Sequence, residues 1–240
     1  MQFLNSSLDK ISSFFNVFMK YHYNEFNKNQ FEVHKLAIDL IKSGSKVLDI
    51  GCATGYFANQ LNKIGCETWG VDNDKVALKR ASKPCKKVII ANLDEAKRIS
   101  APRKYFDFVI VLDVLEHLLH PENVLAIIKN HLKPNGMIIV SIPNIAHASI
   151  RWMLFMGKFE YASTGILDST HVKFYTHASI LELIRSNGYH VLNTIPTNGM
   201  CKVPFLYKIT DRLPMSWQYF IVKRFPTLFA FQYIIVAKPS

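Results

Sequence analysis

The residues best suited to chemistry in this sequence surround a short turn near residue 50. Asp49 lies in an apolar run, and Gly51 and Gly55 follow it within six residues. Because glycine lacks a Cβ atom, a ligand can approach the backbone closely there, and the helix expected over 56–64 offers free N–H groups at its start. Asp49 suits a ligand that carries positive charge. The segment therefore predicts a cofactor cradle with the candidate ligands Asp49, Gly51, Cys52, Ala53, Gly55 and Tyr56.

Polar residues also follow the next apolar runs. Asp72 closes the run over 67–71 and lies 23 residues after Asp49. A carboxylate at the end of a second strand can accept hydrogen bonds from both hydroxyls of a ribose. The turns after the second, third and fourth runs add the candidate cofactor ligands Asp72, Asn73, Asn92, Leu93 and Asp113.

These turns need a sheet that brings them to one edge. Apolar runs predict strands at 47–50, 67–71, 88–90, 106–112, 137–141, 189–194 and 233–237. Apolar periodicity and turn signals predict helices at 8–20, about 29–42, 56–64 and about 177–187. The alternation of strand and helix is typical of an α/β fold of the doubly wound, Rossmann-like type, whose ligands bind beyond the carboxyl ends of the strands.

The segment 47–58, followed in order by Asp72 and the turn 91–94, resembles class I S-adenosylmethionine-dependent methyltransferases. The resemblance implies S-adenosyl-L-methionine as cofactor and a sheet order of 3-2-1-4-5-7-6 with an antiparallel last strand. It also implies that Asn92 lies near the adenine, where the family often has aspartate. The four cysteines form no C-x-x-C pair, so we expect neither a disulfide framework nor a metal site.

A polar segment over 142–176 is predicted to cap the site as an insertion. Its stretch 165–176 resembles a G-x-L-D-x-T-H-x-R/K-F-F/Y-T segment of methyltransferases in bacterial surface-polysaccharide and nucleotide-sugar biosynthesis. His171 is the candidate general base, because imidazole accepts a proton near neutral pH. Asp168 either orients His171, binds a sugar hydroxyl, or braces the loop. The candidate acceptor ligands are His117, His147, Tyr161, Thr170 and Lys173.

Three functions remain open. The first is O- or N-methylation of a sugar, nucleotide-linked or within a glycan. The second is O-methylation of a quinone or other small aromatic acceptor, because the stretch 113–117 also resembles ubiquinone-pathway enzymes. The third is a non-catalytic, cofactor-binding partner of a glycosyltransferase. No nucleic-acid partner is expected, because no RNA-recognition module is visible.

The composition favours one domain of 240 residues, 49% of them hydrophobic. We divide it into N-terminal helices (1–44), a cofactor-binding core (45–195) and an apolar C-terminal region with the last strand (196–240). Tyr21 to Tyr23 predict either a lid over the cofactor or packing on the core. Without a signal peptide or a transmembrane run, the expected location is the cytoplasm.

The net charge of +11 indicates an anionic partner. Residues 200–240 carry many aromatic side chains and six Lys or Arg against one acid, Asp211. This pattern predicts peripheral contact with an anionic membrane at its inner face, or alternatively a helical cover on the sheet or a homodimer contact.

Overall fold

The computed structural model describes residues 26, 28–199, 210 and 212–240. The predicted helix over 8–20 and the aromatic segment 21–23 lie outside these residues. None of the helices within the described ranges is long and apolar enough to cross a membrane.

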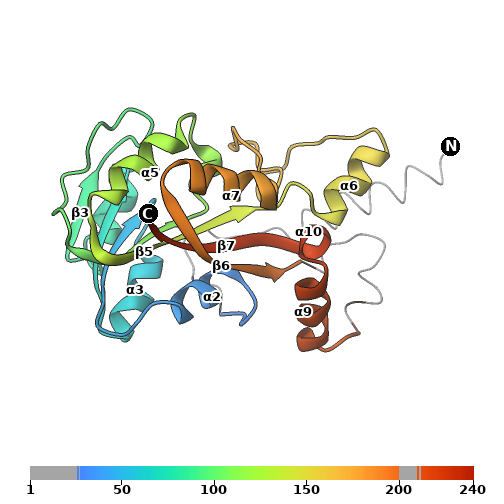
Figure 1. Cartoon of the computed structure of the whole chain (residues 1–240), viewed down its shortest axis with the longest axis horizontal. Helices are drawn as coiled ribbons and strands as arrows, with labels where there is room; N and C mark the ends of the chain where they lie inside the picture. The colour runs from blue at the N-terminus through green and yellow to red at the C-terminus, as the bar shows by residue number, and fades with distance from the viewer. Residues whose placement is uncertain (1–25, 27, 200–209, 211) are drawn as a thin grey trace.

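The described residues form a seven-stranded sheet in the order β3-β2-β1-β4-β5-β7-β6 (Figure 1). Its strands are β1 (Lys46–Ile50), β2 (Glu67–Asp72), β3 (Lys87–Ile90), β4 (Phe106–Leu112), β5 (Leu132–Pro143), β6 (Tyr189–Asn198) and β7 (Ala230–Pro239). The first five strands run parallel. β7 runs antiparallel to both β5 and β6. The predicted fold class, strand order and antiparallel last strand are confirmed.

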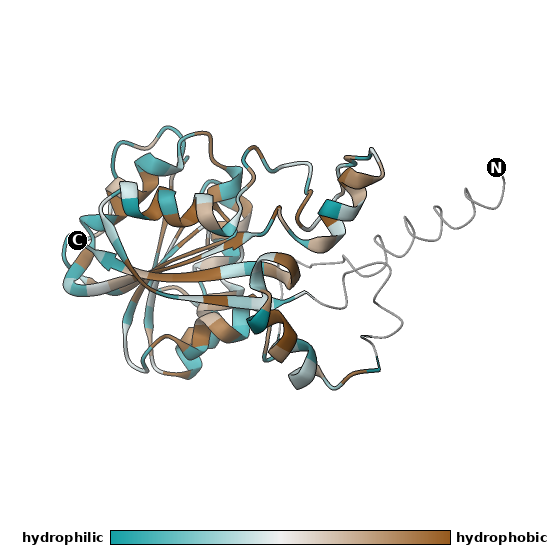
Figure 2. Ribbon diagram, turned by 45° about the vertical axis from the view of Figure 1, so that its right-hand side comes forward, coloured by the Kyte–Doolittle hydropathy of each residue, from teal (hydrophilic) through white to brown (hydrophobic). Residues whose placement is uncertain are grey.

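Helices cover both faces of the sheet (Figure 1). They are α2 (Val33–Asp39), α3 (Tyr56–Lys63), α4 (Lys75–Ala81), α5 (Pro121–Lys129), α6 (Ala148–Phe155), α7 (His177–Ser186), α9 (Met215–Arg224) and α10 (Pro226–Phe229), with the 3-10 helix η1 (Leu115–His117). Residues of α5 and α7 pack into one core cluster, and residues of α2 and α3 into a second. Figure 2 shows the hydrophobic residues, in brown, along the strands and the helix faces turned to them.

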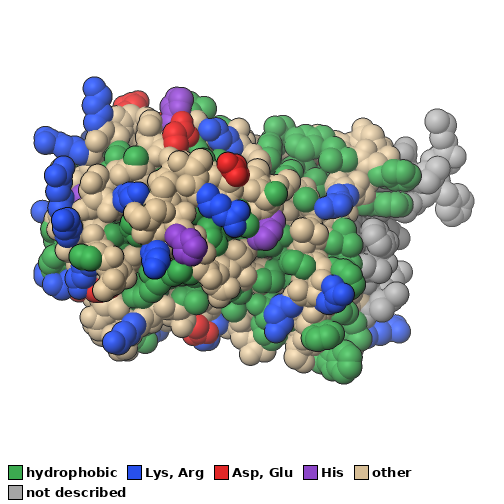
Figure 3. All heavy atoms as spheres, in the orientation of Figure 1, with side chains coloured by type: hydrophobic (Ala, Val, Ile, Leu, Met, Phe, Trp, Pro, Cys, Tyr) green, Lys and Arg blue, Asp and Glu red, His purple; other side chains and the backbone are tan. Residues whose placement is uncertain are grey.

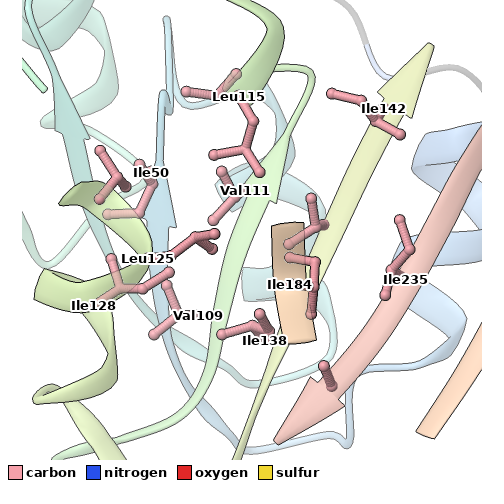
Figure 4. Close-up of a cluster of buried hydrophobic side chains, with 14 of the residues drawn as sticks. Ile50, Val109, Val111, Leu115, Leu125, Ile128, Ile138, Ile142, Ile184 and Ile235 are labelled. Carbon is pink, nitrogen blue, oxygen red and sulfur yellow. The ribbon is translucent and has the colours of Figure 1, made fainter. Parts of the chain in front are cut away.

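The larger core cluster lies between β4, β5 and the helices α5 and α7 (Figure 4). Val109 and Val111 of β4 are fully buried there with Leu125 of α5 and Ile184 of α7. Burying such a side chain stabilises the fold by about 1.5–3 kcal/mol. Because helices cover both faces, β4 is almost continuously apolar, which explains why its predicted bounds match the observed ones.

Several elements differ from their predicted bounds. β5, β6 and β7 extend beyond the apolar runs, because their polar ends still pair with neighbouring strands. α2 is shorter than the predicted helix over 29–42. The capping segment 142–176 contains α6, which the sequence did not predict. Half of the apolar side chains of α6 are exposed, namely Trp152, Leu154 and Phe155, so the helix lacks a clear apolar period facing a core.

Candidate functional site

The cradle turn follows β1 and lies at the carboxyl end of the parallel strands. The N–H groups of Gly51 and Cys52 both donate to the carbonyl of Val71, at 2.8 and 3.1 Å, and thereby fix the turn against β2. Gly51 and Gly55 have φ of 75°, and Ala53 has φ of 44°. These left-handed values favour glycine.

The two cradle glycines are also required by packing inside the protein. A Cβ atom on Gly51 would lie 2.4 Å from Cγ2 of Val114, and one on Gly55 would lie 2.7 Å from Cγ of Pro84. The sequence prediction assigned this close approach to a ligand. In the structure, side chains of the protein itself, and not a ligand, occupy the positions next to these two glycines that a Cβ atom would need.

We expect Gly51→Ala to lower the free energy of unfolding by about 1–3 kcal/mol more than Gly44→Ala does. Gly44 has the same φ of 75°, but no heavy atom lies within 4 Å of the place that a Cβ atom would take, so the difference isolates the contact with Val114. Urea unfolding of both variants measures it. Adding Val114→Ala should restore much of the loss in the Gly51 variant. Equal losses at the two glycines would show that the contact with Val114 costs nothing.

Asp72 ties the end of β2 to the cradle turn. Its Oδ2 accepts from the backbone N–H of Ala53 at 2.8 Å, and its Oδ1 accepts from that of Asp74 at 2.9 Å. Asn92 lies in the turn after β3, exposed, with its Oδ1 accepting from the N–H of Asp94. Asn73 is exposed and Leu93 is buried. The structure therefore gathers the predicted cofactor ligands of β1, β2 and β3 at one edge of the sheet.

Asp49 is a buried carboxyl group without a complete set of partners. It is 5% exposed, and its Oδ2 has no hydrogen-bond partner. Burial, and secondly the charge of Asp72, raise the pKa of Asp49 to about 8. Such an acid is stabilised by an incoming cation. Two other predicted ligands, in contrast to Asp49, already have contacts within the protein. Cys52 is buried against α3 and α4, and the hydroxyl of Tyr56 lies 3.3 Å from Nε2 of His34.

Asp113 has a strained backbone at the end of β4, with φ of 55°. Its Oδ1 accepts from the hydroxyl of Ser141 at 2.6 Å and from Nε2 of Gln232 at 2.8 Å. The Asp113 N–H in turn donates to the Ser141 hydroxyl at 2.9 Å. Side chains from β5 and β7 thus hold this carboxylate at the mouth of a pocket.

The pocket lies where β4, β5, β7 and the capping segment meet. It is lined by Asp113, Glu116, His117, Pro143, Gly165, His171, Phe231 and Gln232. Of the predicted acceptor-site residues, this brings together His117 and His171. Their rings meet edge to face, with centroids 4.8 Å apart.

The hydrogen bonds of His171 define which nitrogen carries its proton. Its Nδ1 lies 3.0 Å from the carbonyl of Ile166, which can only accept, so Nδ1 is the donor. In the neutral ring Nε2 therefore keeps a lone pair, and it lies 4.0 Å from Oε1 of Glu116. Burial lowers the pKa of His171 from its usual 6.5, so the ring is neutral at pH 7. It is in the form that a general base requires.

Glu116 is a second buried acid whose carboxyl group makes no hydrogen bond. Both carboxyl oxygens lack a hydrogen-bond partner, and the residue is 1% exposed. Burial, followed by the charge of Asp113, raises the pKa of Glu116 well above its ordinary value. A buried, unsatisfied carboxyl group at a pocket costs folding free energy, which indicates a role toward a ligand.

Asp168 braces the capping loop. Its Oδ1 accepts from the N–H of Thr170 at 2.8 Å and from its hydroxyl at 2.6 Å. The ring of His171 is oriented by Ile166 instead, which corrects the predicted orienting role of Asp168. Thr170 also contacts His117, since its carbonyl lies 3.2 Å from Nδ1 of that ring.

His147 differs from its predicted role as an acceptor ligand. It is fully buried at the start of α6, where Nδ1 accepts from the N–H of Ser149 and Nε2 lies 3.2 Å from the carbonyl of Gly199. Both nitrogens are therefore used to hold α6. Tyr161 is 58% exposed beside Phe159, and Lys173 is half-buried. Neither lines the pocket.

The cluster at the pocket can also hold a divalent metal ion. Glu116, His117 and His171 each offer one ligand atom, and these atoms lie within 4.8 Å of one another. Two imidazole nitrogens and a carboxylate suit a transition metal or zinc. The sequence predicted no metal, and that remains a prediction.

Sequence reasoning missed Glu116, Ser141, Gln232 and His34. The available signal for Glu116 was its place beside His117, in the short segment that follows the apolar strand β4. Gln232 lies 119 residues from Asp113 in sequence, so no local pattern links them. His34 is buried near the site: burial lowers its pKa, and the charge of Asp113 acts in the opposite direction.

Comparison with known proteins identifies the family. A family model described as a methyltransferase domain matches residues 21–194. The chain belongs to the methyltransferase domain family. Two curated relatives are both called ubiquinone biosynthesis O-methyltransferase. The protein from Bradyrhizobium diazoefficiens is 28% identical over 183 residues, covering 75% of this chain and 70% of that protein. The one from Cereibacter sphaeroides is 30% identical over 171 residues, covering 69% of this chain and 67% of that protein.

A solved methyltransferase has the same fold. The S-adenosylmethionine-dependent methyltransferase from Archaeoglobus fulgidus has a TM-score of 0.60 at 20% identity, over 88% of this chain and 97% of that one. Membership of the methyltransferase family, together with the fold shared with S-adenosylmethionine-dependent methyltransferases, implies S-adenosyl-L-methionine as the cofactor of the present chain. The buried Asp49 carboxyl group fits that cofactor, whose amine and sulfonium are positively charged.

Proposed function

We propose that this methyltransferase modifies a hydroxyl oxygen of a small-molecule acceptor, with His171 as the general base. The observation that supports the proposal is the fixed tautomer of His171. The Ile166 carbonyl accepts from Nδ1, which leaves the Nε2 lone pair beside Glu116 at the pocket. A hydroxyl acceptor benefits from such a base, whereas an amine acceptor only needs to be neutral.

The proposed chemistry is a displacement at one carbon. S-adenosyl-L-methionine supplies an electrophilic methyl group on its sulfonium. His171 takes the hydroxyl proton while the acceptor oxygen bonds to that carbon and the carbon–sulfur bond breaks. The charges of Asp168 and Asp113 favour the imidazolium that results. Most of the protein's contribution is alignment of the two reacting groups.

The cofactor is proposed to bind in the cradle, next to the pocket. Asp49 and Asp113 would face its positively charged methionine end, and Asp72 its ribose. Gly51, Ala53 and Gly55 shape the backbone turn that receives it. Asn73, Asn92 and Leu93 are proposed at the adenine end, because they lie at the carboxyl ends of β2 and β3.

An aromatic hydroxyl is our first candidate for the acceptor. Pro143 and Phe231 give the pocket two apolar ring surfaces, which suit a flat acceptor ring. The names of the curated relatives support O-methylation. Both the pocket chemistry and the family favour an enzyme over a non-catalytic partner of a glycosyltransferase.

A sugar hydroxyl is the second candidate. The stretch 165–176 resembles a segment of polysaccharide and nucleotide-sugar methyltransferases, and it contributes Gly165 and His171 to the pocket. The polar pocket residues Asp113 and Gln232 suit hydrogen bonding to several hydroxyls.

Incubation with methyl-labelled S-adenosyl-L-methionine and separate panels of catechols, hydroquinones, nucleotide sugars and glycolipids tests the proposal. We expect label on an aromatic hydroxyl oxygen, located by mass spectrometry and NMR. Label on a sugar hydroxyl would select the second candidate. Transfer to nitrogen, or none to any panel, would contradict the proposal. Adding EDTA and then Zn²⁺ or Mg²⁺ separates a base, which needs no metal, from a metal-ligand role of His171.

A further inference from the structure

Apolar side chains are exposed at the end of α6 and just after it. Leu154, Phe155, Met156, Phe159 and Tyr161 are between 43 and 79% exposed. Phe155 is the most exposed of them. Exposing this much apolar surface on consecutive turns is unfavourable in water, so it indicates a binding partner.

A second group lies on α9 and at Phe225, directly after it. Met215, Trp217, Phe220 and Phe225 are between 42 and 64% exposed. Gln218 and Val222 of the same helix are buried. α9 is therefore a cover on the core along one side, as one of the alternatives predicted, while Trp217 and Phe220 project from its other side.

The two groups lie at the same end of the molecule as the pocket. Nδ2 of Asn144, just before α6, donates to the carbonyls of Thr227 and Ala230, which ties this segment to α10 and the start of β7. Pro143 and Phe231, which line the pocket, are neighbours of these residues. Figures 1 and 2 both show α6 and α9 at the end where β7 begins. Figure 3 shows hydrophobic side chains gathered there.

Basic side chains outnumber acidic ones in the two segments that carry these apolar groups, although Lys158 pairs with Glu160. Residues 148–162 and 212–225 contain five basic side chains, Arg151, Lys158, Arg212, Lys223 and Arg224, against the single acid Glu160. On α9, the Lys223 ammonium lies 5.3 Å from the ring centre of Tyr219, and the Arg224 guanidinium lies 5.2 Å from that of Phe225. Aromatic rings beside cations are typical of contacts at the boundary between lipid headgroups and acyl chains.

We propose that the surface formed by 151–161 and 212–225, called here the α6–α9 surface, binds an anionic lipid membrane. The charge complementarity selects this partner. A second copy of the chain placed face to face would bring two positive surfaces together. An anionic bilayer instead pairs with the basic side chains while it receives the apolar ones.

Binding in this way would turn the pocket mouth toward the bilayer. The inference extends beyond methyl transfer and is independent of the acceptor, since docking requires neither catalysis nor a particular hydroxyl. It enlarges the contact predicted from residues 200–240 by adding α6.

Co-sedimentation with phosphatidylcholine vesicles, with and without phosphatidylglycerol, tests the surface. We expect the protein to bind only the anionic vesicles and to be released by high salt. The double variant Phe155→Ser/Trp217→Ser should bind at least about tenfold more weakly. The variant should fold normally, because both side chains are exposed in the native protein. Circular dichroism and cofactor binding check that it is folded.

Two charge variants provide a matched control. Lys223→Glu/Arg224→Glu changes the α6–α9 surface, whereas Lys79→Glu/Lys83→Glu makes the same change in net charge in and after α4, beside the edge strand β3. Only the first pair should weaken vesicle binding. Equal effects would show attraction by net charge alone and overturn the proposal. So would wild-type protein that stays in solution with anionic vesicles at low salt, or a homodimer that dissociates in the serine variant.

Discussion

Replacing His171 by Asn is expected to lower kcat by about 100-fold or more, with the dissociation constant of the cofactor nearly unchanged. The Asn side-chain amide can still donate to the Ile166 carbonyl as Nδ1 does, at 3.0 Å in the native protein, but it has no basic nitrogen at the position of Nε2. His171→Ala should be as inactive and less stable. Steady-state kinetics paired with calorimetry of cofactor binding measures both quantities.

His190→Ala serves as the control, because His190 is exposed on β6. The pH dependence adds an independent check. Burial keeps the pKa of His171 below 6.5, so turnover should stay level around neutral pH and fall only on acidification through that lowered pKa. Full activity in the Asn variant would rule out the base role, and loss of its fold would show that His171 braces the loop.

Asp49→Asn is expected to have opposite effects on binding and on stability. Cofactor affinity should fall by about 10- to 100-fold, because an amide cannot pair with a positive charge. The unliganded variant should be more stable at pH 7 by roughly 1–4 kcal/mol, because a neutral amide can be buried without the proton uptake that burial of Asp49 requires at this pH. Calorimetry and urea unfolding measure the two effects.

The sign of the stability effect follows from the pKa of Asp49. Burial and Asp72 raise that pKa to about 8, whereas an unfolded Asp ionises near 3.9. The folded state then binds the extra proton, so this group lowers wild-type stability progressively as pH rises from about 4 to about 8. Asp39→Asn, an exposed change of the same charge, should leave cofactor affinity unchanged and alter stability by no more than about 0.5 kcal/mol, because it removes only an exposed ion pair with Lys35. A destabilised Asp49→Asn variant would contradict the interpretation of Asp49 as a buried acid that destabilises the unliganded protein and binds a cation.

The fold was predictable because its central parallel strands, β1 and β4, are buried on both faces. Phe106–Leu112 is apolar almost throughout, Asp72 is the last residue of β2, and Asp113 directly follows β4, so elements and their polar ends could be found locally. The helix α6 could not be predicted from the sequence, since its exposed apolar residues follow no core-facing period.

The site was predictable only where its residues are close in sequence. The capping stretch predicted His171, but Asp168 three residues earlier bonds to Thr170, while a backbone carbonyl orients the ring. A carbonyl has no sequence signature. The network of Ser141 and Gln232 around Asp113 depends on strand pairing, which places residues far apart in the chain beside each other.

The position of β7 has a consequence for how the protein is made. β7 lies between β5 and β6, yet it follows both of them along the chain. During synthesis β6 emerges first and has no neighbour to pair with until residues 230–239 leave the ribosome. Gln232 arrives with them, so the strained conformation of Asp113 receives its support at the same late moment. The nascent chain therefore completes its sheet and the pocket beside Asp113 together, and a premature stop before β7 yields neither.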